Sequence, residues 1–162
     1  MECQFKIREL QEDDMHHIHM MIKELANFEK MPEGPKLSAE NLAEDFKNKA
    51  FFGFIAFLKD EPAGMALYYL PYSTWEGVCI HLEDLYIRPQ FRKGGLGRKM
   101  VAVVCKVAQE KNYKRVQWNV LDWNPARSFY QKLEAENISE TEGWLIYRLS
   151  PEQISKIASE AD

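Results

Sequence analysis

The spacing of hydrophobic residues predicts helices and strands along the whole chain. A period of two predicts a strand at residues 4–8, and apolar residues at helical spacing predict a helix around residues 18–25. Ser38 can cap a second, short helix that carries Leu42 and Phe46. Strands are predicted next, the first two as an antiparallel hairpin; they cover residues 51–58, 63–70 and 78–87.

The second half begins with a basic, glycine-containing loop at residues 88–97 and a helix at 98–109. The residues expected on the buried face of that helix are Val101, Val104, Cys105 and Ala108. A strand at 114–120, a short helix at 125–133, a last strand at 144–149 and a capped helix from Ser150 complete the order. We therefore expect an α/β fold, a mixed sheet with helices on its faces, in a single domain over residues 1–162.

Composition and charge narrow the functional classes. The 162 residues, 46% of them hydrophobic, suit one domain with a sizeable core. A net charge of −4 disfavours a nucleic-acid partner and allows a cationic small molecule. We expect neither a membrane span nor a secretory signal, because every uncharged run is short. A cytoplasmic protein is expected because its three cysteines show no pairing pattern, which suits a reducing compartment.

Cysteine and histidine give no pattern of a metal site. Cys3, Cys79 and Cys105 have unrelated spacings, which predicts neither a disulfide framework nor a metal centre. An acyl-cysteine intermediate is disfavoured because neither Cys79 nor Cys105 has a neighbouring His with a further acid, so both are expected to be core thiols. Surface or interface positions are expected for His16, His17 and His19.

The glycine loop is the strongest chemical signal. Gly94, Gly95 and Gly97 let backbone approach a ligand closely, and the following helix offers N–H groups and a positive dipole end to a phosphate. Further charge is expected from the nearby Arg88, Arg92, Lys93, Arg98 and Lys99. The loop fits neither a P-loop nor a dinucleotide fingerprint. A glycine turn with solvated cations is the alternative that spacing alone leaves open.

Several motifs in order resemble the GNAT superfamily of N-acetyltransferases. The loop Arg92-x-x-Gly95-x-Gly97 follows a strand at residues 81–87 that contains Leu82-Glu83-Asp84, and later come Trp123-Asn124 and Glu142-Gly143-Trp144. These motifs are similar to those of the diamine acetyltransferase group, over nearly the whole chain. Within that group, residues 28–30, 72–75 and 120–124 resemble the thialysine branch more than the polyamine branch.

The resemblance implies a GNAT fold with a mostly antiparallel sheet, acetyl-CoA as donor, no metal and a homodimer. The implied cofactor-binding residues are Leu85, Tyr86, Ile87, Arg92, Lys93, Gly94, Gly95, Leu96, Gly97, Arg98, Asn124 and Arg127. The implied substrate-binding residues are Phe28, Glu29, Trp75, Glu83, Asp84 and Glu142. Two departures stand out: six positions separate Asn124 from Tyr130, where seven are usual, and Glu134 replaces a usual glycine.

Amine acetylation needs a proton acceptor for the ammonium group and a proton donor for the departing thiolate. Glu83 matches the family's substrate-side acid, with a strand-edge salt bridge as the alternative. Because Glu83 and Asp84 are adjacent on a strand, we expect them to point to opposite faces. Tyr130 matches the family's general acid, with core packing against Phe129 as the alternative.

The expected activity is direct transfer of acetyl from acetyl-CoA to a small primary amine. A lysine-like amine such as thialysine is favoured over a polyamine because Ser73 stands where the polyamine enzymes have an aspartate. Two alternatives stay open from the sequence, a spermidine/spermine acetyltransferase and an acyl-CoA-binding module without activity.

Overall fold

The structure is a computed structural model that describes residues 5–161. Its helices and strands form two compact units, divided between residues 121 and 122. Each unit is described by itself. Gln4, at the start of the first predicted strand, and Cys3 lie outside the described residues. No helix of the described residues is long and apolar enough to cross a membrane.

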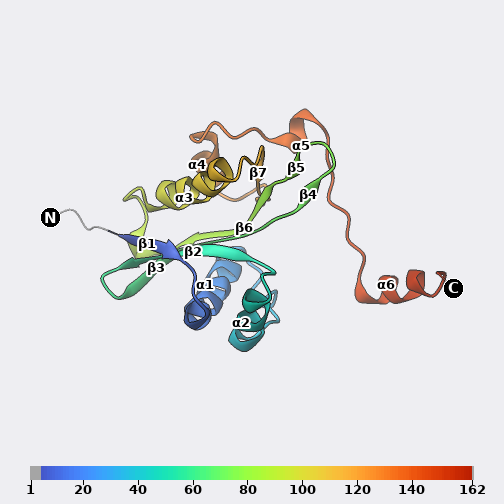
Figure 1. Cartoon of the computed structure of the whole chain (residues 1–162), viewed down its shortest axis with the longest axis horizontal. Helices are drawn as coiled ribbons and strands as arrows, with labels where there is room; N and C mark the ends of the chain where they lie inside the picture. Colours follow the sequence, from blue (N-terminus) through green and yellow to red (C-terminus); the bar gives the residue numbers. More distant parts are fainter. Residues whose placement is uncertain (1–4, 162) are drawn as a thin grey trace. The chain divides into compact units, whose positions relative to one another are not determined.

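The first unit is built on a five-stranded sheet in the order β1-β2-β3-β6-β7 (Figure 1). The strands are β1 (Lys6–Glu9), β2 (Phe52–Leu58), β3 (Glu61–Tyr69), β6 (Ile80–Ile87) and β7 (Val116–Gln117). All neighbours pair antiparallel except β6 and β7, which are parallel. This confirms the mixed, mostly antiparallel sheet and the predicted hairpin. A separate ribbon of β4 (Tyr72–Ser73) and β5 (Gly77–Val78) forms where a loop was expected.

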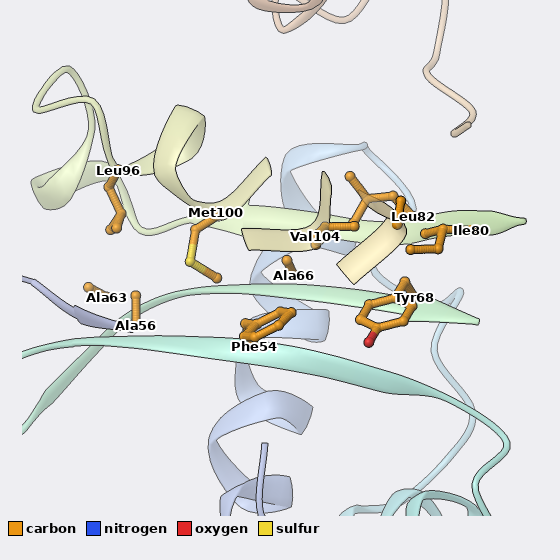
Figure 2. Packing of buried hydrophobic residues seen from close by; sticks show 11 residues of the cluster. Phe54, Ala56, Ala63, Ala66, Tyr68, Ile80, Leu82, Leu96, Met100 and Val104 are labelled. Carbon is orange, nitrogen blue, oxygen red and sulfur yellow. The ribbon is translucent and has the colours of Figure 1, made fainter. Parts of the chain in front are cut away.

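Helices cover both faces of this sheet, as predicted. One face carries α3 (Leu96–Glu110), whose Leu96, Met100 and Val104 pack on Phe54, Ile80 and other strand residues (Figure 2). The other face carries α1 (Met15–Phe28) and α2 (Ala39–Lys47). The short helices η1 (Glu12–Asp14) and η2 (Pro89–Phe91) were not predicted.

Ser38 caps α2 as expected, because its hydroxyl accepts a hydrogen bond from the Asn41 N–H at 3.2 Å. The buried stripe of α3 was wrong in one member, since Cys105 is exposed while Val101, Val104 and Ala108 are buried. Cys105 follows Val104 by one residue, which turns its side chain about 100° away from the stripe.

The second unit contains three helices among its described residues: α4 (Arg127–Gln131), α5 (Ile138–Thr141) and α6 (Pro151–Ala158). The predicted cap of α6 is confirmed, with Ser150 accepting from the Gln153 N–H. The predicted strand at 144–149 is wrong, because these residues are extended without a ladder partner among the described residues. Five of its apolar side chains are exposed: Trp144, Leu145, Ile146, Tyr147 and Leu149.

A β-bulge interrupts the pairing of β3 with β6. Leu67 lies opposite Asp84 while Tyr68 lies opposite Leu82, so Glu83 is an extra residue in β6. The bulge changes which face the side chains take: Leu82 packs under α3, whereas Tyr86 packs with α1. Side chains therefore do not alternate strictly between the two faces of the sheet at Glu83 and Asp84, although the prediction that these two residues point to opposite faces assumed it.

Candidate active site

The edge of β6 that faces β7 is mostly unpaired. Its described pairs with β7 are Ile80 with Val116 and His81 with Gln117. Beyond His81 the backbone of β6 continues as far as Ile87 with no partner strand along that edge within residues 5–161. The segment contains Leu85, Tyr86 and Ile87, the residues expected to bind the pantetheine arm of acetyl-CoA. An open strand edge offers N–H and C=O groups to such an extended amide-bearing chain.

The glycine loop opens directly onto α3. Gly95 has a left-handed backbone with φ +78°, and Lys93 has φ +69°. The first helical hydrogen bond runs from the Lys99 N–H to the Gly95 carbonyl, so the N–H groups before it are not used by the helix. A Cβ placed on Gly94 or Gly95 would meet no atom within 4 Å. The loop therefore has the open space and the donors that a pyrophosphate needs.

Arg92 links this loop to the end of α1. Its Nε donates to the carbonyl of Ile87 at 2.7 Å. Its guanidinium lies 5.4 Å from the ring centre of Phe28 and 5.6 Å from that of Tyr86. The structure thus brings together three residues that were assigned separately to substrate and cofactor.

Arg88 was predicted to add a positive charge for a phosphate beside the glycine loop, and this prediction is wrong. Its guanidinium is engaged by both Glu24 oxygens at 2.8 and 3.1 Å and donates to the Pro62 carbonyl. Because this ion pair is largely buried and uses three N–H groups of the guanidinium, the Arg88 side chain ties the end of β6 to α1.

Three carboxylates gather beside the bulge. Burial and then the charge of Glu83 raise the pKa of Glu29, which follows α1. Burial, then Glu83, then Glu29 raise the pKa of Asp84 to about 7. Leu67 and Tyr69 share one face of β3, and they lie opposite Asp84 and His81. Glu83 Oε2 lies 3.5 Å from the Nε2 of His81, so Glu83 and Asp84 lie on the same face of the sheet, contrary to the expectation that they face apart. The bulge at Glu83 is the physical reason.

The acidic cluster is suited to a cation. A carboxyl group with a pKa near 7 is partly protonated at neutral pH and ionises fully when a positive charge binds next to it. Glu83 itself is reachable from solvent, with 59% of its side chain exposed. An ammonium group that enters here would meet both a charge partner and a proton acceptor.

Trp75 stands at the tip of the β4–β5 ribbon and is 80% exposed. Ser73 holds that tip, because its Oγ accepts from the N–H groups of Trp75 and Glu76 at 3.2 and 3.3 Å. Arg115 pairs with Glu76 at 2.5 Å. The serine that replaces a polyamine-site aspartate therefore has a structural role in the turn.

The remaining predicted site residues lie in the second unit. Asn124 is buried, and its Oδ1 accepts from the Ala126 N–H at 2.8 Å just before α4. Arg127 donates to the Asp122 carbonyl and lies 3.6 Å from Glu140. Tyr130 lies in α4, its ring centre 5.3 Å from that of Phe129. Glu142 accepts from the Trp144 indole at 2.6 Å.

His81 was not among the site residues predicted from the sequence. Its imidazole is buried, and its Nε2 lies 3.5 Å from Glu83 Oε2. The sequence could have indicated it, because Cys79, His81 and Glu83 stand at alternate positions of one strand. Cys79 therefore does have a neighbouring histidine followed by an acid, contrary to the expectation stated for both cysteines. The buried Cys79 thiol nevertheless points to the Pro71 carbonyl at 3.4 Å, as a core thiol would.

Neither metal nor thiol chemistry has support from this geometry. Partial burial raises the pKa of the Cys105 thiol, which makes the nucleophilic thiolate scarcer. Among the described residues, no group of three or more His, Cys, Asp or Glu side chains could hold a metal ion. The rings of His16 and His17 are tilted at 45° to each other, with centres 3.7 Å apart.

A mixed sheet with an open strand edge, a glycine loop that begins a helix and an acidic cluster beside that edge define an acyltransferase that uses a phosphate-bearing donor. The chain belongs to the acetyltransferase (GNAT) family, whose model matches residues 13–134. It is an N-acetyltransferase with acetyl-CoA as the acetyl donor, which confirms the expected family, fold class, enzyme class and donor.

Three related proteins illustrate this similarity. The chain is 45% identical over 157 residues to a thialysine N-epsilon-acetyltransferase of Caenorhabditis elegans, covering 96% of this chain and 98% of that protein. It is 30% identical to human spermidine/spermine N(1)-acetyltransferase-like protein 1, covering 96% of this chain and 24% of that protein. The fold matches that of AAC(6')-Iy in complex with the bisubstrate analogue CoA-S-monomethyl-acetylneamine, at TM-score 0.74 and 20% identity over 91% and 99% of the chains.

Proposed function

We propose that this acetyltransferase acts on the side-chain amine of small lysine-like amino acids, with thialysine as the model substrate. The observation that carries the proposal is the placement of Glu83 and Asp84 on one face of β6, where the charges of Glu83 and Glu29 also raise the pKa of Asp84. Such a group of carboxylates suits one ammonium group. The 45% identity to a thialysine N-epsilon-acetyltransferase over nearly the full length supports it.

In this proposal Glu83 is the proton acceptor. An alkylammonium has a pKa near 10, so it must lose a proton before its nitrogen can attack. Glu83 takes that proton directly or through a water molecule, and the neutral nitrogen then forms a bond to the thioester carbonyl carbon. Asp84 and Glu29 hold the cation beforehand, and Phe28, Trp75 and Glu142 complete the substrate site.

The carbon–sulfur bond then breaks, and the CoA thiolate takes a proton from the phenol of Tyr130 in this scheme. The nitrogen, which carries one excess proton after attack, releases that proton to water as the amide forms, and the Tyr130 phenolate regains a proton from water. The cofactor contacts proposed for the donor are the β6 edge at Leu85, Tyr86 and Ile87, the loop residues Arg92, Lys93, Gly94, Gly95, Leu96, Gly97 and Arg98, and Asn124 with Arg127. The open space over Gly94 and the position of the loop at the N-terminus of α3, where the helical hydrogen bonds begin at the Lys99 N–H, support the loop contacts.

A polyamine substrate is the second candidate, favoured by the similarity to a spermidine/spermine acetyltransferase-like protein. Each further ammonium of a polyamine needs its own partner when it leaves water. Ser73 supplies no charge, and its Oγ is occupied by the turn of the β4–β5 ribbon. We therefore rank the polyamine below the lysine-like amine.

Steady-state kinetics with thialysine, lysine, spermidine and spermine in one buffer test the proposal. We expect kcat/KM to be highest for thialysine, by about fivefold or more over spermidine, since a lost ion pair at a partly exposed site is worth ~1 kcal/mol. The Ser73→Asp variant should improve spermidine relative to thialysine. Equal or higher kcat/KM for spermidine in the unmodified enzyme would transfer the assignment to the polyamine.

We also propose that the enzyme is a cytoplasmic homodimer. The row of exposed apolar side chains at 144–149 supports a second copy as partner, because a soluble monomer rarely exposes so many in succession. The absence of nucleic-acid binding is expected from the net charge of −4.

A further inference from the structure

His81 is a buried histidine in the strand that carries the proposed proton acceptor. It is 7% exposed and lies opposite Tyr69 of β3 in the sheet register. The two rings stack with centres 4.9 Å apart and planes 30° from parallel. Because the imidazole is buried and stacks on the Tyr69 ring, its orientation is fixed by packing rather than by solvent.

The imidazole reaches Glu83 across the start of the bulge. His81 Nε2 lies 3.5 Å from Glu83 Oε2, a distance that a small rotation of the carboxylate shortens to a hydrogen bond. Glu83 has 59% of its side chain exposed and is the extra residue of β6, so regular pairing does not restrain it. A flexible exposed glutamate loses rotamer entropy whenever it must adopt one geometry.

We propose that His81 is a positioning residue for Glu83: its Nε2–H binds one carboxylate oxygen and leaves the other directed at the incoming ammonium group. The proposal rests on the role given above to Glu83 and adds the group that orients it. With the proton on Nε2, a neutral imidazole is a donor at that atom and needs no change of charge during the reaction.

Other titratable groups face this pair from each neighbouring element. The Tyr69 phenol comes from β3, and burial followed by the charge of Glu83 raises its pKa. Asp84 comes from β6 and Glu29 from the end of α1. All three groups are neutral or negatively charged. Beside such groups, a hydrogen-bond donor stabilises the Glu83 carboxylate.

The experiment compares His81→Gln, His81→Asn and His81→Leu, because a Gln side-chain amide reaches close to the place of Nε2 whereas an Asn amide does not. We expect His81→Asn and His81→Leu to lower kcat about tenfold at pH 7 and His81→Gln to stay within about threefold. KM for acetyl-CoA should change less than twofold. The loss should shrink as pH approaches 10, where the amine needs no base. His16→Gln, an exposed histidine on α1, serves as a control for all assays.

A double-mutant cycle separates the two proposals. If His81 acts through Glu83, adding His81→Asn to Glu83→Gln should cost no further kcat. Losses that multiply, or a loss that does not vary with pH, would make His81 a structural residue. Full kcat in all three His81 variants would overturn the positioning role and leave Glu83 intact. Full kcat in Glu83→Gln would instead overturn the role proposed for Glu83.

Discussion

At the scale of single residues, the site depends on groups that the folded protein holds away from their ordinary chemistry. Asp84 has a raised pKa because burial and two neighbouring carboxylates oppose its ionisation. Such a group stabilises a bound cation but destabilises the protein without one, a frequent cost of functional sites.

The Asp84→Asn variant should show this cost. The folded pKa of about 7 lies above the value of 3.8 for an unperturbed carboxyl group, so the folded protein binds more protons between these values and loses stability as pH rises. At pH 8 the variant should be more stable by on the order of 2–4 kcal/mol, and the gain should nearly vanish at pH 4. Urea unfolding at both pH values measures it, with Asp60→Asn in an exposed turn as control. An equal gain at both pH values would contradict the raised pKa.

Glu134 shows a different residue-scale cost. It ends α4 with φ +60°, and the N–H groups of Glu134 and Ala135 bond to the carbonyls of Gln131 and Tyr130. This is the Schellman arrangement, whose left-handed position favours glycine. The usual glycine of the family is therefore missing where the backbone still needs it, which resolves the turn that the sequence left uncertain.

We expect Glu134→Gly to stabilise the protein by about 1 kcal/mol, because glycine adopts positive φ without strain. Thermal unfolding followed by circular dichroism measures the change. Lys132→Gly, at an ordinary helical φ of −70° in the same turn, is the matched control and should be destabilising. A loss of stability in Glu134→Gly would mean that the glutamate side chain contributes more than its backbone costs.

At the scale of elements, hydrophobic spacing predicted α1, α2, the β2–β3 hairpin, β6 and α3 because each buries one continuous face against a neighbour. It failed where a tertiary property decides the outcome. A strand at 144–149 needs a partner that local spacing does not specify, and the bulge at Glu83 is a property of the β3–β6 pairing. The glycine loop was predicted from residue type and Glu83 from the resemblance, whereas His81 was not predicted although it stands two residues from both Cys79 and Glu83.

The loop before α3 allows an element-scale prediction. Gly94→Val should leave the fold intact, because its φ is not left-handed and a Cβ there meets no atom within 4 Å. The branched side chain would fill the space proposed for the pyrophosphate, so KM for acetyl-CoA should rise at least about tenfold, or about 1.4 kcal/mol. Gly94→Ala should show a smaller effect. Unchanged KM in a folded Gly94→Val protein would remove the loop from the donor site.

At the scale of the whole molecule, the exposed row at 144–149 predicts self-association. Light scattering after size-exclusion chromatography should give the mass of a dimer for the unmodified protein at micromolar concentration. Replacing Leu145 and Ile146 together by Glu should favour the monomer, since burying two charges in an apolar interface is costly. Met20→Glu, at an exposed position of α1, is the matched control. A monomeric unmodified protein would contradict the proposal.

The extra residue in β6 also bears on how this site can change. Leu82 packs on the α3 side, and Asp84 lies opposite Leu67 of the core on the α1 side, so these two residues would alternate regularly if Glu83 were absent. Deleting Glu83 would therefore remove the carboxylate and the bulge together and leave the later side chains of β6 on their present faces. A deletion at a regularly paired position of the same strand would instead move side chains to the opposite face and disturb both cores. The bulge is thus the position at which β6 can lose a residue while both cores keep their side chains.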